Sequence, residues 1–241
     1  MNRIFFILLS FSFLCAHTTN QDSLPNWKYY SQLSVVQDLE SQSGLGFYFR
    51  VKRVNGNQFN DFRLFGNYLN NDSYLYLRHK SSHIFSGYNK FYRFITVSYE
   101  QNTLADLNVR YHYNNGFGYF IQKNNQGNIT SELGIAYDMS DYLNASWKTS
   151  YIKYAFTWDA KFSKIESKME LEYFSQISDI NESDLSRFQG LGELQFHIWE
   201  NVSFFVTFIQ ELDKNTQYNR GATTISYSIG WEKPLKGKYF K

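Results

Sequence analysis

Two histidines and two serines occur together in the stretch HKSSH, where His79 and His83 enclose Ser81 and Ser82. A serine next to a histidine can act as a nucleophile activated by a general base, which is the chemistry of many hydrolases. Side chains that follow one another along a strand or turn point apart, however, and no acidic residue stands beside these histidines to orient them. We therefore expect no catalytic site in this stretch.

Two further histidines, His112 and His197, fall on the polar faces of predicted strands. Arg110 lies two residues from His112 on the same face, and Glu193 lies four residues from His197. A metal ion at either histidine would need two or three further ligands from other parts of the chain, and the sequence does not identify them. We expect both histidines to belong to hydrogen-bonded networks, and we predict no catalytic residue, no cofactor and no metal site.

The segment around His112 alternates between apolar and polar residues from Asp106 to Gln122. Its odd-numbered positions carry most of the apolar side chains: Leu107, Val109, Tyr111, Tyr113, Phe117, Tyr119 and Ile121. This period of two indicates a strand with one apolar and one polar face. A strand in a soluble domain usually has about five or six residues. The length here therefore favours a strand that crosses a bilayer at a tilt.

The same alternation recurs along the chain between breaks rich in Asn, Gly, Asp and Ser, which are turn-forming residues. The pattern predicts strands at Gln42–Arg53, Asn57–Leu69, Ser73–His83, Lys90–Gln101, Ala105–Gln122, Asn128–Asp138, Tyr151–Ser163, Ile165–Ile177, Asp184–Ile198, Val202–Leu212 and Arg220–Glu232. A closed bacterial barrel normally has an even number of strands. We therefore expect ten to twelve and favour twelve, with the missing strand in Trp27–Glu40 or His79–Lys90.

The composition excludes several other classes of protein. The chain has 241 residues, a formal net charge of +2 and 20% aromatic residues, with 20 Tyr, 23 Phe and 5 Trp. Positive and negative residues are interleaved, which argues against a nucleic-acid partner. No window after the N-terminal segment approaches the roughly 18 consecutive apolar residues of a membrane-spanning helix.

The N-terminal residues have the features of an export signal. Arg3 precedes an apolar run from Ile4 to Leu14, which is long enough for a signal-peptide core and too short to span a bilayer. We predict a signal peptide at residues 1–16, an N-terminal periplasmic segment at 17–41 and an outer-membrane β-barrel at 42–241. Cys15, the single cysteine, lies at the expected cleavage junction, where a lipid-modified N-terminus is the alternative.

Two all-β folds compete for this pattern. In a soluble barrel of lipocalin type the apolar faces would point inward and about eight strands would suffice. In a membrane barrel they point outward to lipid, and the interior is polar. The strand count, the aromatic residues and the charged faces favour an all-β, antiparallel transmembrane β-barrel of the bacterial outer membrane.

The run Phe91–Ile121 resembles a pair of strands in the salt-induced outer-membrane-protein family, YdiY-like, which is also called domain of unknown function 481. The matching residues are Tyr99, Glu100, Leu107, Asn108, Gly116, Gly118 and Tyr119. The segments Glu132–Asp138, Glu170–Asp213 and Thr223–Trp231 follow the order of that family, and the resemblance spans roughly Ser41 to Trp231. It implies an outer-membrane barrel of unassigned activity that is linked to salt or osmotic stress, and it transfers no active-site residues.

The expected function is therefore that of a structural or narrow-pore barrel and not that of an enzyme. The alternatives are a lipid-modifying or proteolytic barrel enzyme and a soluble periplasmic binding barrel. Expected partners are outer-membrane lipid with lipopolysaccharide, and the barrel assembly machinery during biogenesis.

The polar faces of the strands carry both signs of charge, which predicts ion pairs between strands and a lumen of small or closed conductance. The cations on these faces are Arg110, Lys153, Lys161, Lys168 and Arg187. The anions are Glu132, Asp138, Asp159, Glu166, Glu170, Glu172, Glu193 and Glu211.

Overall fold

The computed structural model describes residues 26–38, 43–70, 72–103, 107–124, 126–141, 147–178, 184–214 and 223–234. The predicted signal peptide and Cys15 lie outside the described residues. Among the described residues, no helix is long and apolar enough to cross a membrane.

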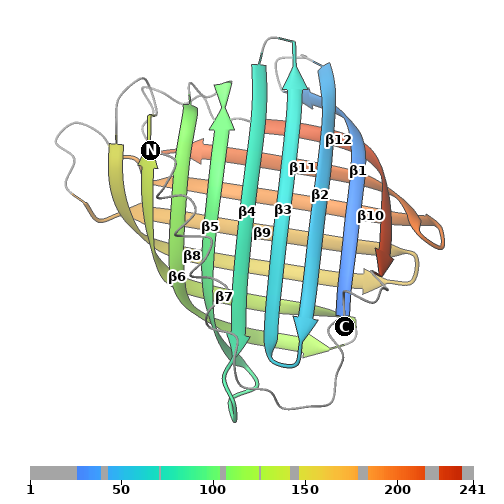
Figure 1. Ribbon diagram of the computed structural model, residues 1–241, viewed down its shortest axis with the longest axis horizontal. Coiled ribbons are helices and arrows are strands. Elements are labelled where there is room, and N and C mark those ends of the chain that lie inside the picture. Colours follow the sequence, from blue (N-terminus) through green and yellow to red (C-terminus); the bar gives the residue numbers. More distant parts are fainter. Residues whose placement is uncertain are drawn as a thin grey trace.

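Twelve long strands make up the described fold (Figure 1). In chain order they are β1 Asn26–Asp38, β2 Ser43–Asn55, β3 Gln58–Leu69, β4 Asp72–Ile84, β5 Phe91–Asn102, β6 Leu107–Asn124, β7 Gly127–Ser140, β8 Trp147–Phe162, β9 Ile165–Gln176, β10 Arg187–Trp199, β11 Val202–Asp213 and β12 Thr223–Pro234. Each strand pairs antiparallel with its neighbours in the chain, and β1 pairs with β12, so the sheet closes into a barrel. In Figure 1, β1–β5 form the near wall and β8–β11 run across the far wall.

The strand that sequence reasoning left out is β1. It lies in Trp27–Glu40, one of the two expected places, while His79–Lys90 holds only the end of β4 and a connection to β5. Residues 26–38 therefore belong to the barrel wall, and the prediction of a separate N-terminal segment at 17–41 is wrong for them. The alternation is interrupted here because Val35 and Val36 are both apolar, yet Val35 is exposed and Val36 is buried.

The two ends of the barrel differ in the length of their connections. At the end where β1 begins and β12 ends, four of the five connections between consecutive strands have only two residues, for example Gly56 and Asn57 between β2 and β3. Gly56 has φ +53°, a left-handed conformation that glycine adopts without steric cost. The opposite end has the longest connections, from residue 177 to 186 and from 214 to 222. This asymmetry is typical of outer-membrane barrels, whose short turns are periplasmic.

The barrel is apolar outside and polar inside. Among the described residues, 25 buried side chains are polar or charged and 11 are hydrophobic, the reverse of a soluble core. On β8 the alternation is plain, because Tyr154 and Phe162 are 49% and 61% exposed whereas Lys153 is 1% exposed. An apolar exterior around a closed ring of paired backbone is what a bilayer requires. The fold is thus an antiparallel transmembrane β-barrel of the outer-membrane type, as predicted.

Candidate functional site

Ion pairs cross the lumen between strands on opposite walls. Arg63 on β3 donates to Glu170 on β9 at 3.3 Å, although six strand positions separate the two around the ring. Arg78 on β4 reaches the same carboxylate at 3.7 Å. On the wall itself, Lys168 contacts Glu170 at 2.5 Å. One carboxylate therefore holds three cations, and the two walls are joined through it.

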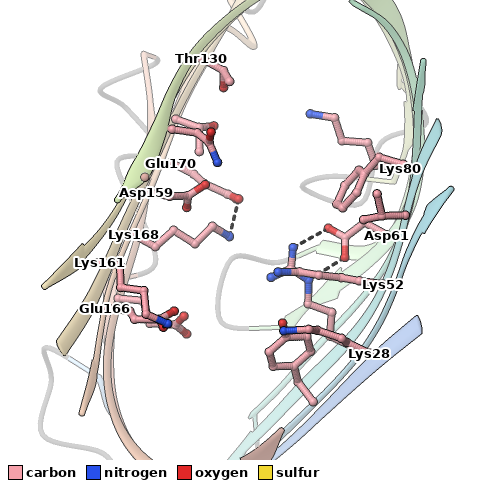
Figure 2. Close-up of a pocket in the computed structure, with 18 of the residues that line it drawn as sticks. Lys28, Lys52, Asp61, Lys80, Thr130, Asp159, Lys161, Glu166, Lys168 and Glu170 are labelled. Atoms are coloured by element: carbon pink, nitrogen blue, oxygen red, sulfur yellow. Dashed lines mark hydrogen bonds and ion pairs between the residues drawn. The ribbon is translucent and has the colours of Figure 1, made fainter. Parts of the chain in front are cut away.

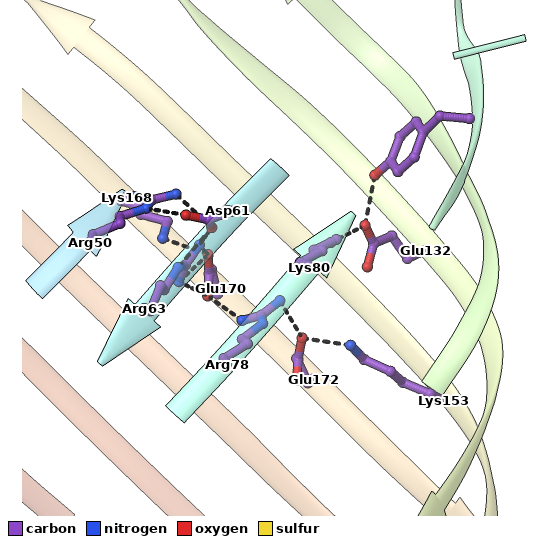
Figure 3. A network of polar contacts seen from close by, with 11 residues as sticks. Arg50, Asp61, Arg63, Arg78, Lys80, Glu132, Lys153, Lys168, Glu170 and Glu172 are labelled. Carbon is purple, nitrogen blue, oxygen red and sulfur yellow. Dashed lines mark hydrogen bonds and ion pairs between the residues drawn. The ribbon is translucent and has the colours of Figure 1, made fainter. Parts of the chain in front are cut away.

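The ion pairs around Glu170 belong to a first layer of charged residues, which also includes residues on either side of them (Figure 3). Asp61 accepts hydrogen bonds from Arg50 at 2.6 Å and from Arg63 at 2.8 Å, so it links β2 to β3. Glu172 accepts from Lys153 at 2.7 Å and lies 4.0 Å from Arg78. The layer ends at Glu132, which accepts hydrogen bonds from Lys80 and from the Tyr92 hydroxyl.

A second layer lies further from the short-turn end. Arg110 on β6 contacts Glu100 on β5 and Glu211 on β11, each at 3.0 Å. Arg187 on β10 contacts Asp138 on β7 at 2.7 Å, and Asp138 also binds His112. A cavity of about 10 Å³ lies beside these residues, which is room for about one water molecule. The two layers therefore place contacting charged side chains across the lumen.

The lumen is open on the other side of the first layer. A cavity of about 850 Å³, here called the vestibule, extends from that layer to the short-turn end, where Gly56, Asn124 and Asn201 line its mouth. Its volume falls in the range of small-molecule binding sites. Figure 2 looks into it and shows charged side chains projecting from both walls. The two layers of ion pairs, here called the floor, thus lie at the inner end of the vestibule.

The two walls of the vestibule carry opposite charge. On β1–β4 its lining has a net charge of +5, from the following charged residues: Lys28, Arg50, Lys52, Arg63, Arg78, Lys80 and Asp61. On β7–β10 the lining has a net charge of −4, with His197 neutral, from these residues: Glu132, Asp159, Glu166, Glu170, Glu172, Glu193, Lys161 and Lys168. The mixed charge of the interior was predicted, but its separation onto two walls was not.

The histidines lie as follows. His79 is half-buried on the outer face of β4, opposite Phe62 and Val97, while Ser82 lines the vestibule on the inner face. His79 and Ser82 therefore point to opposite sides of the barrel wall. His112 points inward, where it contacts Asp138 and Asn114, so its placement in a hydrogen-bonded network is confirmed.

His197 lies between a hydroxyl and a carboxylate at the vestibule wall. Its Nδ1 is 3.0 Å from Ser203 Oγ, and its Nε2 is 3.1 Å from Glu166 Oε1. With the proton on Nε2, the imidazole accepts from the serine hydroxyl and donates to the glutamate. Gln195 donates to the same Oγ at 3.1 Å. The expected network at His197 is confirmed, but its partner is Glu166, and Glu193 bonds Thr207 instead.

Sequence reasoning missed Ser203 because this contact depends on a hairpin with an irregular register. The β10–β11 pairing places His197 opposite Ser203 and shifts between His197 and Trp199. The sequence predicts a short connection between Ile198 and Val202, so aligning the two strands across it could have found the pair. Among the described residues, no group of three or more His, Cys, Asp or Glu side chains could hold a metal ion.

Comparisons with known proteins agree with this architecture. The model of a family described as "Protein of unknown function, DUF481" matches residues 41–231. No curated protein matches the sequence. Among solved structures, the NanC porin aligns with a TM-score of 0.57 and 9% identity, over 83% of this chain and 98% of that chain. At this identity the likeness shows a shared fold.

Two further porins align with lower scores. The KdgM porin aligns with a TM-score of 0.48 and 10% identity, over 84% of this chain and 98% of that chain. An anion-selective porin from Comamonas acidovorans aligns with a TM-score of 0.43 and 8% identity, over 88% of this chain and 99% of that chain. A barrel of twelve strands with an apolar exterior fits the outer membrane.

Proposed function

The chain belongs to the DUF481 family, and from its geometry we propose that it is an outer-membrane barrel of closed or very low conductance. The observation that carries this proposal is the set of ion pairs across the lumen, above all Arg63 with Glu170 and Arg110 with Glu211. A wide channel selective for one ion sign would show a ring of one charge at its constriction. Here each cation of the floor faces a carboxylate at contact distance.

The proposed orientation places the short turns and the mouth of the vestibule in the periplasm. The short connections at that end support it, since periplasmic turns of outer-membrane barrels are short. The outer face then contacts membrane lipid with lipopolysaccharide, and the assembly machinery inserts the chain. The resemblance to salt-induced outer-membrane proteins supports a role in the response of the envelope to salt or osmotic stress. A strain that lacks the gene should then grow more slowly at high salt.

Planar-bilayer recording in potassium chloride tests the closed lumen. We expect a small or absent conductance with weak ion selectivity. The double variant Arg63→Ala with Glu170→Ala removes one bridge from the floor and should conduct more, which provides a matched open control. A large, stable conductance of the unaltered protein with a strong preference for anions or cations would refute the proposal. A gel with and without heating tests the barrel itself, because a folded barrel migrates differently after heating.

A hydrolase is a second candidate, and the contacts of His197 favour it over the HKSSH stretch. Ser203, His197 and Glu166 have the order of nucleophile, base and orienting acid, and they lie at the wall of an open cavity. Against it, Ser203 is 4% exposed, and Gln195 occupies its oxygen. Labelling with a fluorophosphonate that disappears in Ser203→Ala would support a hydrolase. Absence of labelling in the folded protein would leave a structural hydrogen-bonded network.

A further inference from the structure

Lys52 and Asp159 are a cation and an anion of the vestibule, and neither has an ion-pair partner among the described residues. Lys52 lies on β2 and Asp159 on β8, which are six positions apart around the ring and therefore on opposite walls. Figure 2 shows both side chains projecting into the open space. Among the described residues, neither Lys52 nor Asp159 takes part in an ion pair.

The surroundings of each group keep it available. The ammonium of Lys52 stands 4.8 Å from the centre of the Tyr30 ring, a cation–π contact that orients it and leaves its hydrogen-bond donors free. Its neighbour Arg50 is already bound to Asp61. Across the vestibule, Lys168 is opposite Asp159 in the register but contacts Glu170 instead. Both Lys52 and Asp159 are half-buried, so each is partly removed from water.

The charges that line the rest of the vestibule favour the same arrangement of a bound molecule as Lys52 and Asp159 do. Its β1–β4 wall is net positive and its β7–β10 wall net negative, so the field runs across the lumen from the wall of Lys52 to the wall of Asp159. Low-dielectric walls strengthen such a field within a cleft. A simple anion is attracted to one wall and repelled by the other, and the same holds for a simple cation. A molecule that carries both charges gains at both walls.

We propose that the vestibule binds small zwitterionic solutes, with the carboxylate of the solute at Lys52 and its ammonium group at Asp159. The cavity of about 850 Å³ has room for such a molecule with several waters. This inference goes beyond the proposal of a closed barrel. A solute binds in the vestibule through its open mouth and its charged walls, whether or not ions pass through the floor. It therefore stands or falls separately from the conductance measurement.

A matched set of probes tests the proposal directly. The probes are 4-aminobutanoate, butanoate and butylamine, which share a chain of four carbon atoms. The first carries both charges, the second only the negative charge and the third only the positive charge. Saturation-transfer NMR with the purified barrel in lipid nanodiscs, compared with empty nanodiscs, measures binding. We expect 4-aminobutanoate to bind at least about tenfold more tightly than either singly charged probe, which corresponds to about 1.4 kcal/mol. Equal binding of the three probes, or no binding of the zwitterion, would overturn the proposal.

Four variants assign the two ends of the ligand. Lys52→Gln and Asp159→Asn should each reduce zwitterion binding about tenfold or more. Exchange of the two charges in Lys52→Asp with Asp159→Lys should restore binding, because the ligand can then bind in the opposite direction. Glu200→Gln changes an exposed carboxylate at the same mouth and should leave binding within about twofold. If the single variants bind normally, or the exchange fails to restore binding in a barrel that remains heat-modifiable, the assignment is wrong.

Discussion

Replacement of Glu170 by glutamine is the sharpest test of the floor, because this carboxylate contacts three cations. Arg63 lies at 3.3 Å, Arg78 at 3.7 Å and Lys168 at 2.5 Å. With an effective dielectric constant of about 20, the gross attraction of the Arg63 pair is about 5 kcal/mol. Desolvation of the charges offsets much of this gain in the folded state. Removal of the carboxylate, however, leaves the cations buried without it, and such a change typically costs about 3–5 kcal/mol.

We therefore expect Glu170→Gln to lower the free energy of unfolding by about 3–5 kcal/mol. Equilibrium unfolding in urea from lipid vesicles, followed by tryptophan fluorescence, measures this change. The control is Glu200→Gln, since Glu200 is exposed and surface substitutions usually stay within about 0.5 kcal/mol. If Glu170→Gln changed the free energy of unfolding as little as Glu200→Gln does, the floor would be hydrated and would not hold the walls together.

A double-mutant cycle separates the bridge across the lumen from the local pair. Arg63→Met combined with Glu170→Gln removes both members of the bridge, so the double variant should be less destabilised than the sum of the single variants. Coupling energies between residues in direct contact are usually about 0.5–3 kcal/mol. Strictly additive effects would mean that Arg63 and Glu170 do not interact in the membrane.

Three further outcomes follow from other parts of the barrel. Leu133 points outward near the middle of β7, so Leu133→Arg should lower the free energy of unfolding by about 2–4 kcal/mol. Phe162 points outward near the end of β8, so Phe162→Arg should cost only about 0–1 kcal/mol. Equal costs in urea unfolding would contradict the outward apolar band. A Cβ atom on Gly118 would lie 2.1 Å from the Tyr92 ring, so Gly118→Ala should break the 2.9 Å bond from Tyr92 to Glu132 and cost about 1.5–3 kcal/mol; unchanged unfolding would show that the ring has room to move. Hydrogen bonds from Lys214 and Ser186 lower the pKa of Asp184 below its ordinary value, so this contact is intact above the pKa of an unfolded aspartate and is lost as the pH falls through the folded one; an NMR titration midpoint at or above the ordinary value would contradict it.

Much of the wall could be predicted from alternation alone. The faces of β8 and β9 agree with the prediction: Trp158 and Tyr173 point outward, while Lys153 and Glu172 point inward. Alternation specifies a face because successive side chains in a strand point to opposite sides. It failed at β1, where an apolar residue, Val36, occupies the inner face at 0% exposure.

The partners of the inward charges could not be predicted in the same way. Arg63 and Glu170 are 107 residues apart, and their contact depends on the tilt and stagger of strands across the whole ring. The sign of each wall also depends on which strands lie opposite one another, which requires the strand number. Eleven strands were located and the twelfth had two candidate places, so the opposition of β2 to β8 could not be stated. The separation of charge in the vestibule therefore became visible only with the closed barrel.

The cross-lumen pairs also constrain how this protein can be made. Arg63, Arg78 and Arg110 find their distant carboxylates only when the sheet has curved round and β1 has met β12, the last strand of the ring. Before that moment, the inner faces of a growing sheet present these charges to water, which carries little cost. The stabilisation from the ion pairs of the floor thus arises only when β1 and β12 pair and close the barrel. A barrel built in this way closes cooperatively, and a chain without β12 would have neither a seam nor a floor.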